Sequence, residues 1–194
     1  MSELKKMVII SGYAGSGKDT VAAYLRDKLN LKGTGLPQWE VFALADAVRD
    51  TASVIFNLDY GVQDQYLYDP KYKNEKIPGY KYSGREMCQI IGNEMRELFH
   101  SEVWCDNLYS RIMEWEPINA IISDNRYPNE VKYFEDKFDV TTLRIDRPEK
   151  DGNVGISNHP SEANVIPTEF TIVNDGTLDQ LYAKVDKFIE DLLD

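Results

Sequence analysis

Residues 7–20, MVIISGYAGSGKDT, join a continuous apolar run to a glycine-rich loop and a lysine. The run MVIIS predicts a strand that is covered on both faces, as in a parallel sheet. After the loop, apolar residues from Val21 to Leu29 recur at helical spacing, so a helix follows directly. Strand, loop and helix in this order are half of a βαβ unit, from which parallel sheets are built.

The loop between this strand and helix fits the Walker A pattern, because two glycines five positions apart precede a lysine. Glycines let backbone N–H groups turn inward toward phosphate oxygens, and the helix N-terminus adds about half a positive charge. A glycine turn that only joins strand to helix is the alternative, and the full context argues against it. The residues expected to bind a triphosphate are Gly12, Ala14, Gly15, Ser16, Gly17, Lys18, Asp19 and Thr20.

A magnesium site is expected beside the loop, but its direct protein ligand is open. The position that usually carries Ser or Thr as the ligand is Asp19, and Thr20 follows it. Either Thr20 or a water held by Asp19 can take this role. Asp124 follows a buried strand predicted over 118–123, at the edge where ligands bind in open α/β sheets. A carboxylate there can hold water on a magnesium ion.

Two arginines are expected at the same sheet edge. Arg126 lies two residues after Asp124 and can fork onto a phosphate. Arg147 follows a strand predicted over 140–145 and is placed to bridge donor and acceptor phosphates. The alternatives are an Asp124 that caps the next helix with Arg126 in a surface ion pair, and a solvated Arg147 before a proline turn.

The rest of the chain predicts an α/β fold. Strands alternating with helices indicate a doubly wound parallel sheet with helices on both faces. Ser83 and Glu86 have the spacing of a capping box, and Thr177 is the expected cap of a closing helix. Further strands are predicted over 39–44 and 170–173, and helices over 46–57, 84–99, 128–138 and 178–192.

Two segments interrupt this alternation within a single predicted domain, residues 1–194. Residues 57–83 contain six tyrosines without a clean period, which predicts an irregular excursion. It is interpreted as an acceptor-base lid, a cover over exposed core or a dimer arm. Residues 147–160, rich in Gly, Asp and Asn, are a candidate lid that excludes water from the site.

Composition excludes several functional classes. Hydrophobic residues make up 42% and charged residues 28% of the 194 positions, as in an ordinary globular protein. The apolar runs are far shorter than the roughly 20 residues of a membrane span, and a cytoplasmic location is expected. The net charge of −11 disfavours a nucleic-acid partner. Cys88 and Cys105 are expected to be reduced thiols.

Several stretches, in their shared order, resemble the bacteriophage deoxynucleoside monophosphate kinases, within the nucleoside monophosphate kinase fold. The phage enzymes also carry Asp after the loop lysine. The resemblance implies a P-loop NTPase three-layer fold with a five-stranded parallel sheet, ATP as donor, Mg²⁺ as cofactor and a deoxynucleoside 5′-monophosphate as acceptor. If the protein is phage-encoded, the expected cytoplasm is that of the host. The stretches are SGYAGSGKDT, FALADAVRD, GREMCQIIGNEMRELFHSEVW, SDNRYPNEV, LRIDRP, SEANVIP and FTIVNDGTLDQLYAKV.

The resemblance also assigns residues to roles. It implies that Lys18 binds the donor phosphates, that Asp124 belongs to the metal shell, and that Arg126 and Arg147 contact the transferring phosphoryl group. The residues that it places on the acceptor side are Asp46, Arg49, Arg85, Glu94 and Arg126, and on the ATP side Asn174. For Arg49 and Arg85, a plain solvated or ion-paired arginine is the alternative.

The resemblance is incomplete at one motif, and rival functions stay open. Related sequences often read Gly-Thr-Glu where this chain has Gly92-Asn93-Glu94. One rival is a kinase of another small phosphorylated metabolite, such as a phosphomevalonate-like compound. A second is a regulatory module that binds ATP without transferring phosphate. The accepted bases, deoxy or ribo preference, and a homodimer are also open.

Overall fold

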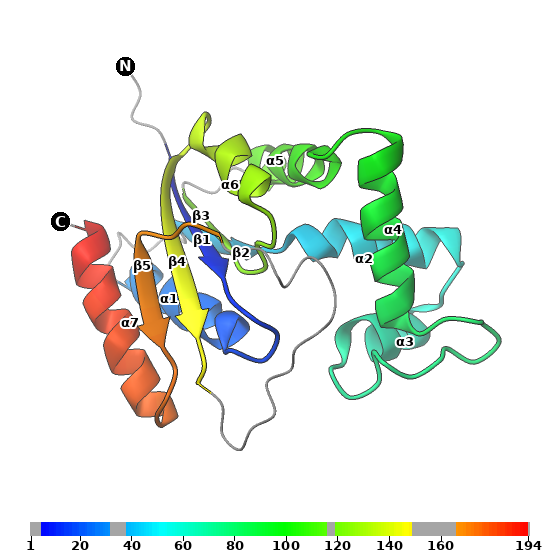
Figure 1. Ribbon diagram of the computed structural model, residues 1–194, viewed down its shortest axis with the longest axis horizontal. Helices are drawn as coiled ribbons and strands as arrows, with labels where there is room; N and C mark the ends of the chain where they lie inside the picture. Colours follow the sequence, from blue (N-terminus) through cyan, green and yellow to red (C-terminus); the bar gives the residue numbers. More distant parts are fainter. Residues whose placement is uncertain (1–4, 32–37, 116–118, 149–165, 194) are drawn as a thin grey trace. The chain divides into compact units, whose positions relative to one another are not determined.

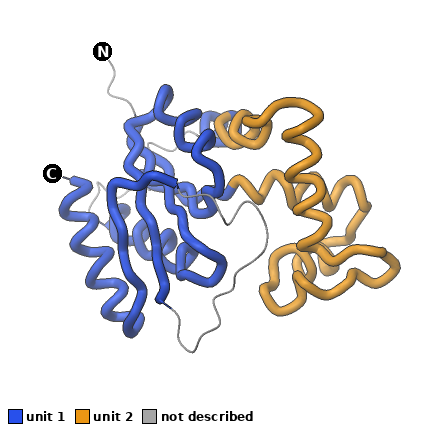
Figure 2. Tube along the Cα trace, viewed as in Figure 1, with its two compact units in different colours: residues 1–43, 110–194 blue, residues 44–109 orange. Residues whose placement is uncertain are grey.

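The computed structural model describes residues 5–31, 38–115, 119–148 and 166–193. It has two compact units, coloured separately in Figure 2: unit 1 comprises residues 1–43 and 110–194, and unit 2 residues 44–109. The single kinase domain predicted from the sequence stays a prediction, and the two units are described separately. From residue 149 onward, the candidate lid at 147–160 lies outside the described residues.

Unit 1 is built on a five-stranded sheet in which every neighbouring pair of strands is parallel. The strand order is β2-β3-β1-β4-β5, so the strand before the glycine loop is central. Helices flank this sheet (Figure 1), and the predicted three-layer fold is confirmed. The strands are β1 (Lys6–Ser11), β2 (Trp39–Phe42), β3 (Asn119–Ile122), β4 (Asp139–Asp146) and β5 (Phe170–Val173).

The first and last helices cover one face of the sheet. Alternate residues of β1, Val8 and Ile10, are buried in one cluster with apolar residues of α1 (Lys18–Leu31) and α7 (Leu178–Leu193). The rings of Tyr24 and Tyr182 stack with centroids 3.9 Å apart and join the two helices. The helix that carries the glycine loop therefore rests on both the sheet and the C-terminal helix.

The opposite face carries the other β1 side chains, because successive residues of a strand point to opposite sides. Met7 and Ile9 are fully buried there. Helix α6 (Pro128–Glu135) buries Val131 and Phe134 and contacts β4. The predicted helix over 128–138 is confirmed, with an end a few residues earlier.

Unit 2 is helical. Its elements are α2 (Leu44–Ile55), α3 (Tyr60–Gln63), the π-helix η1 (Asp64–Tyr68), α4 (Gly84–Leu98) and the first part of α5 (Val103–Trp115), which ends in unit 1. The Ser83–Glu86 capping box of α4 is confirmed. Helix α5 is not among the predicted helices, although Trp104, Leu108 and Ile112 repeat every four residues and are buried.

The tyrosine-rich segment 57–83 is less irregular than predicted, because α3 and η1 lie within it. It packs closely on the start of α4: a side chain at Gly84 would collide with the carbonyl oxygen of Tyr66. The hydroxyl of Tyr80 donates to Phe56 O at 2.6 Å. The segment is thus fixed at both ends within unit 2. Across the described ranges, no helix is both long and apolar enough to cross a membrane.

Candidate active site

The glycine loop runs from the end of β1 to the start of α1 and uses backbone angles that favour glycine. Gly12, Gly15 and Gly17 have φ values of 141°, 77° and 104°. A Cβ at Gly12 would collide with the carbonyl oxygen of Ile145 in β4, whereas one at Gly15 would meet nothing within 4 Å. The first glycine is therefore required by close packing, and the second by backbone conformation.

Lys18 begins α1 and turns its side chain back over the loop. Its Nζ donates to Gly12 O and to Tyr13 O, both at 2.8 Å. An ammonium group held across the loop mouth is placed to exchange these carbonyl oxygens for phosphate oxygens. The predicted role of Lys18 is consistent with this position.

Two predicted site residues that follow later strands donate hydrogen bonds to carbonyl oxygens of the loop. Asn174, which follows β5, donates from Nδ2 to Ser16 O at 2.9 Å. Arg147, which follows β4, donates from Nη1 to Gly15 O at 3.2 Å. The C-terminal ends of parallel strands meet at one sheet edge, and the structure brings both residues to the loop at this edge.

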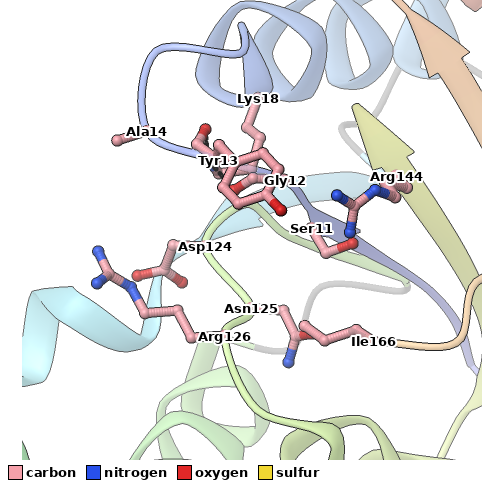
Figure 3. Close-up of a pocket in the computed structure, with 10 residues that line it drawn as sticks. All are labelled: Ser11, Gly12, Tyr13, Ala14, Lys18, Asp124, Asn125, Arg126, Arg144 and Ile166. Carbon is pink, nitrogen blue, oxygen red and sulfur yellow. Dashed lines mark hydrogen bonds between the residues drawn. The ribbon is translucent and has the colours of Figure 1, made fainter. Parts of the chain in front are cut away.

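A pocket opens beside the loop, with a volume of about 60 Å³. Among the described residues, the pocket is lined by the cations Lys18, Arg126 and Arg144 and by one carboxylate, that of Asp124. Figure 3 shows Asp124 and Arg126 together on one side, and Arg144 with Ser11 and Tyr13 on the other. Positive charge thus prevails locally in a chain whose net charge is −11, and the pocket suits a small anion. Its lining is completed by Ser11, Gly12, Tyr13, Ala14, Asn125 and Ile166.

The turn Asp124-Asn125-Arg126 is held by a buried glutamate of α6. Oε2 of Glu130 accepts from Asn125 Nδ2 at 2.8 Å, from Arg126 N at 2.8 Å and from Tyr127 N at 3.1 Å. Glu130 is 1% exposed, so the carboxylate is a fixed part of the turn. Its contacts fix the backbone that carries Asp124 and Arg126, both of which line the pocket.

Some polar atoms at the pocket lack partners. Among the described residues, the buried atoms Ser11 Oγ, Ser16 Oγ and Asn125 Oδ1 make no hydrogen bond. Ser11 and Asn125 line the pocket. Because Nδ2 of Asn125 is held by Glu130, its Oδ1 remains as an acceptor. Buried polar atoms without partners are costly, and here they indicate that the pocket is completed by ligand or water.

The predicted metal residues differ in position. Asp124 lines the pocket, whereas Asp19 and Thr20 are exposed in the first turn of α1. Among the residues that the structure describes, no three His, Cys, Asp or Glu side chains gather to hold a metal. Oxygen donors without a full protein cage fit Mg²⁺, which usually keeps several waters and binds one or two carboxylates plus substrate phosphates.

The predicted acceptor residues Asp46, Arg49, Arg85 and Glu94 belong to unit 2. Arg49 Nη1 pairs with Asp46 Oδ1 at 2.7 Å, and its guanidinium lies 4.9 Å from the ring centroid of Tyr68. Arg85 and Glu94 both lie on α4, Arg85 half-buried in its first turn and Glu94 exposed. The structure therefore brings Asp46 and Arg49 together.

Sequence reasoning missed Arg144, Ser11 and Tyr13 as pocket residues. A usable signal was present, because Arg144 is a charged residue between the apolar Leu143 and Ile145 of a buried strand. That Arg144 lies opposite Ser11 follows only from the strand register, which the sequence does not reveal. Among the described residues, Cys88 and Cys105 form no disulfide.

Known proteins resemble the chain at the level of sequence. It is 25% identical over 202 residues to a protein named "Putative deoxynucleotide monophosphate kinase" of Acanthamoeba polyphaga mimivirus, covering 92% of this chain and 94% of that protein. It is also 25% identical to the deoxynucleoside-5′-monophosphate kinase of Escherichia phage T5, over 82% of this chain and 84% of the relative. No protein-family model matches the chain. The resemblance to deoxynucleoside monophosphate kinases is confirmed at this identity, and it supports the class of P-loop nucleotide kinases.

The solved structures that the chain resembles are more distant in sequence. One is an APS kinase of Mycobacterium tuberculosis in complex with AMPPNP and APS, at 14% identity and a TM-score of 0.48, covering 97% of this chain and 99% of that one. Another is a dephospho-CoA kinase from Campylobacter jejuni, at 12% identity and a TM-score of 0.47, covering 96% and 97%. Scores of this size say nothing about the substrate.

Proposed function

We propose that the chain is a deoxynucleoside monophosphate kinase that transfers the γ-phosphoryl group of ATP to a deoxynucleoside 5′-monophosphate. The observation that carries the proposal is the glycine loop with Lys18 across its mouth, beside a pocket lined by Asp124 and Arg126. The two sequence relatives, both named as kinases of deoxynucleotide monophosphates, supply the acceptor class.

In the proposed reaction, an oxygen of the acceptor phosphate forms a bond to the γ-phosphorus of ATP. The bond between that phosphorus and the β–γ bridging oxygen breaks, and ADP leaves. An acceptor phosphate is already ionised near neutral pH, so no general base is needed. The chain must therefore align two phosphates and offset their charge, which are the main tasks in phosphoryl transfer.

Different residues bind the donor phosphates, the transferring phosphoryl group and the metal ion in the proposed reaction. Backbone N–H groups of the loop and the Lys18 ammonium bind the donor phosphates, and Lys18 gives up its carbonyl partners Gly12 and Tyr13 to do so. Arg126 and Arg147 stabilise the charge of the transferring group. Mg²⁺, when bound, would neutralise charge on the donor phosphates, and Asp124 would hold it, with Asp19 or Thr20 as further oxygen donors.

On the acceptor side, we propose that Arg49 and Arg85 bind the phosphate of the monophosphate, with Asp46 and Glu94 on the nucleoside side. The ion pair with Asp46 leaves Arg49 further N–H donors, because a guanidinium has five. Asn174 supports the ATP side through its bond to Ser16 O.

The decisive experiment is an acceptor panel. The chain is incubated with ATP, Mg²⁺ and each deoxy or ribo monophosphate, and ADP release is followed by a coupled assay. We expect turnover with at least one deoxynucleoside monophosphate, and Lys18→Ala should lower kcat by at least about a hundredfold while the fold is kept.

Two results would contradict the proposal. Turnover only with a phosphorylated metabolite that lacks a base would favour the phosphomevalonate-like alternative. Tight ATP binding without transfer to any acceptor would favour a regulatory module.

A further inference from the structure

Arg144 lines the pocket, and no role has yet been assigned to it. Its side chain is 21% exposed. Nε donates to Asp146 Oδ1 at 2.7 Å, and no hydrogen bond joins its terminal nitrogens to any described residue. Four N–H donors on a largely covered cation are expensive to leave unpaired. A partner is therefore expected inside the pocket.

The position of Arg144 is set by the sheet. The β1–β4 register places it directly opposite Ser11, the last residue before the glycine loop. Both residues line the same pocket as Lys18, and Figure 3 shows the guanidinium of Arg144 near the Ser11 hydroxyl. Ser11 is 1% exposed, and its Oγ has no hydrogen-bond partner. The guanidinium of Arg144 and the hydroxyl of Ser11 can therefore both donate hydrogen bonds to one acceptor in the pocket.

The guanidinium is held on two sides. Asp146 binds its Nε, and the ring of Tyr13 lies 5.3 Å from its central carbon. Tyr13 belongs to the glycine loop itself, so the loop and β4 together fix the direction of the free N–H groups. A preorganised guanidinium loses less entropy when it binds an anion than a mobile one does.

We propose that Arg144 is an additional phosphate-binding residue of this pocket, and that Tyr13 and Asp146 are positioning residues for its guanidinium. The ligand is an oxyanion, because Arg144, Lys18 and Ser11 all offer donors. That this oxyanion is a nucleotide phosphate rests on the proposed function. Ser11 Oγ contributes a neutral hydrogen bond to the same anion.

The first test is Arg144→Ala, with kcat/KM for ATP and calorimetric ATP affinity as readouts. Loss of a charge-assisted hydrogen bond should lower kcat/KM about 10- to 100-fold. Millimolar guanidinium ion should restore part of the activity, because it can occupy the vacated place. The matched control is Arg26→Ala, which removes an arginine with the same 2.7 Å carboxylate contact, on Asp27, outside the pocket. It should change kcat/KM less than about twofold.

The second test concerns positioning. Tyr13→Phe keeps the ring and should retain kcat/KM within about twofold, whereas Tyr13→Ala should lower it about three- to fivefold. In the Arg144→Ala background, Tyr13→Ala should have no further effect, because its contribution passes through the guanidinium. Asp146→Asn should behave as Tyr13→Ala does.

Specific outcomes would overturn the inference. The assigned role would be excluded if Arg144→Ala kept the wild-type kcat/KM. It would also be excluded if guanidinium did not restore the lost activity and the losses from Arg144→Ala and Tyr13→Ala were fully additive. If Arg144→Ala fails to fold, Arg144→Lys decides, with an expected loss of at least about fivefold because the fork is missing. If the wild-type chain binds ATP but transfers phosphate to no acceptor, only the proposed function is contradicted. The role of Arg144 is then still tested by the ATP affinity of Arg144→Ala.

Discussion

Arg144 in unit 1 and Arg49 in unit 2 have the same kinds of partner, but different elements of the structure supply the aromatic ring. Each guanidinium has a carboxylate oxygen at 2.7 Å, from Asp146 or Asp46, and a tyrosine ring about 5 Å away. In unit 1 the ring belongs to the glycine loop and the arginine lines a pocket. In unit 2 the ring of Tyr68 belongs to a π-helix, an element often found at functional sites.

The two regions differ in whether backbone conformation or side-chain contacts shape them. The phosphate site of unit 1 depends on glycines in positive-φ conformations and on strand ends that meet at one edge. In unit 2, Arg49 depends on an ion pair with Asp46 within α2 and on a contact with the ring of Tyr68. Substitutions of the loop glycines should therefore act through backbone strain, whereas substitution of Arg49 should act through lost charge.

The largest effect is expected at Gly12. Gly12→Ala should lower the free energy of unfolding by about 3 kcal/mol, because the new methyl meets the carbonyl of Ile145 at a positive φ. Gly15→Ala in unit 1 and Gly79→Ala in unit 2 are matched controls with positive φ and open space, and each should cost about 1 kcal/mol. Urea unfolding measures all three. Equal losses would show that close packing at Gly12 is not decisive.

Glu130 should give the next largest effect. Glu130→Gln removes a buried charge that accepts three N–H donors, and we expect a loss of about 2 kcal/mol in thermal or urea unfolding. The matched variant in unit 2 is Glu86→Gln, an exposed capping glutamate, and it should lose less. A Glu86 loss as large as that at Glu130 would break the distinction between the two units.

Arg49 tests the acceptor side. Arg49→Ala should raise KM for the monophosphate about tenfold with little change in KM for ATP, as expected for one charge-assisted contact. Arg96→Ala is the control within unit 2, because Arg96 donates to the backbone oxygen of Ser101. A parallel rise in KM for ATP in Arg49→Ala would argue against a role restricted to the acceptor.

The smallest effect concerns pH. Hydrogen bonds from Ser83 hold the pKa of Glu86 below its ordinary value of 4.5. A lowered pKa means that ionised Glu86 stabilises the fold above about pH 4.5, and that this contribution is lost as pH falls through the folded pKa. The stability difference between wild type and Glu86→Gln should therefore shrink below pH 4.5 in thermal unfolding. A constant difference down to pH 3 would contradict the assigned cause.

Much of unit 1 was predictable because its signals are local. The apolar run of β1, the loop glycines and the apolar spacing of α1 lie within residues 7–29, and each follows from short-range geometry. The Ser83–Glu86 box of unit 2 was predictable for the same reason. The position of Arg147 at the sheet edge also needed only the rule that parallel strands end at one edge.

The remaining features depend on contacts between distant residues. Arg144 enters the pocket through its register with Ser11, more than a hundred residues earlier. The contact of Arg49 with Tyr68 depends on how η1 packs, and the tyrosine-rich segment has no periodicity from which this follows. Such pairings are set by tertiary packing, which overrides local preference.

The bond from Asn174 to Ser16 O has a consequence for synthesis of the protein on the ribosome. The glycine loop is synthesised before its outer support, because Asn174 lies 158 residues after Ser16. Its neighbour Ile145 also follows it in the chain. Contacts of such long sequence separation slow folding. A nascent chain thus carries the complete loop sequence while β4 and β5 are still being made, and it acquires the loop's supported shape only after β5 has been made.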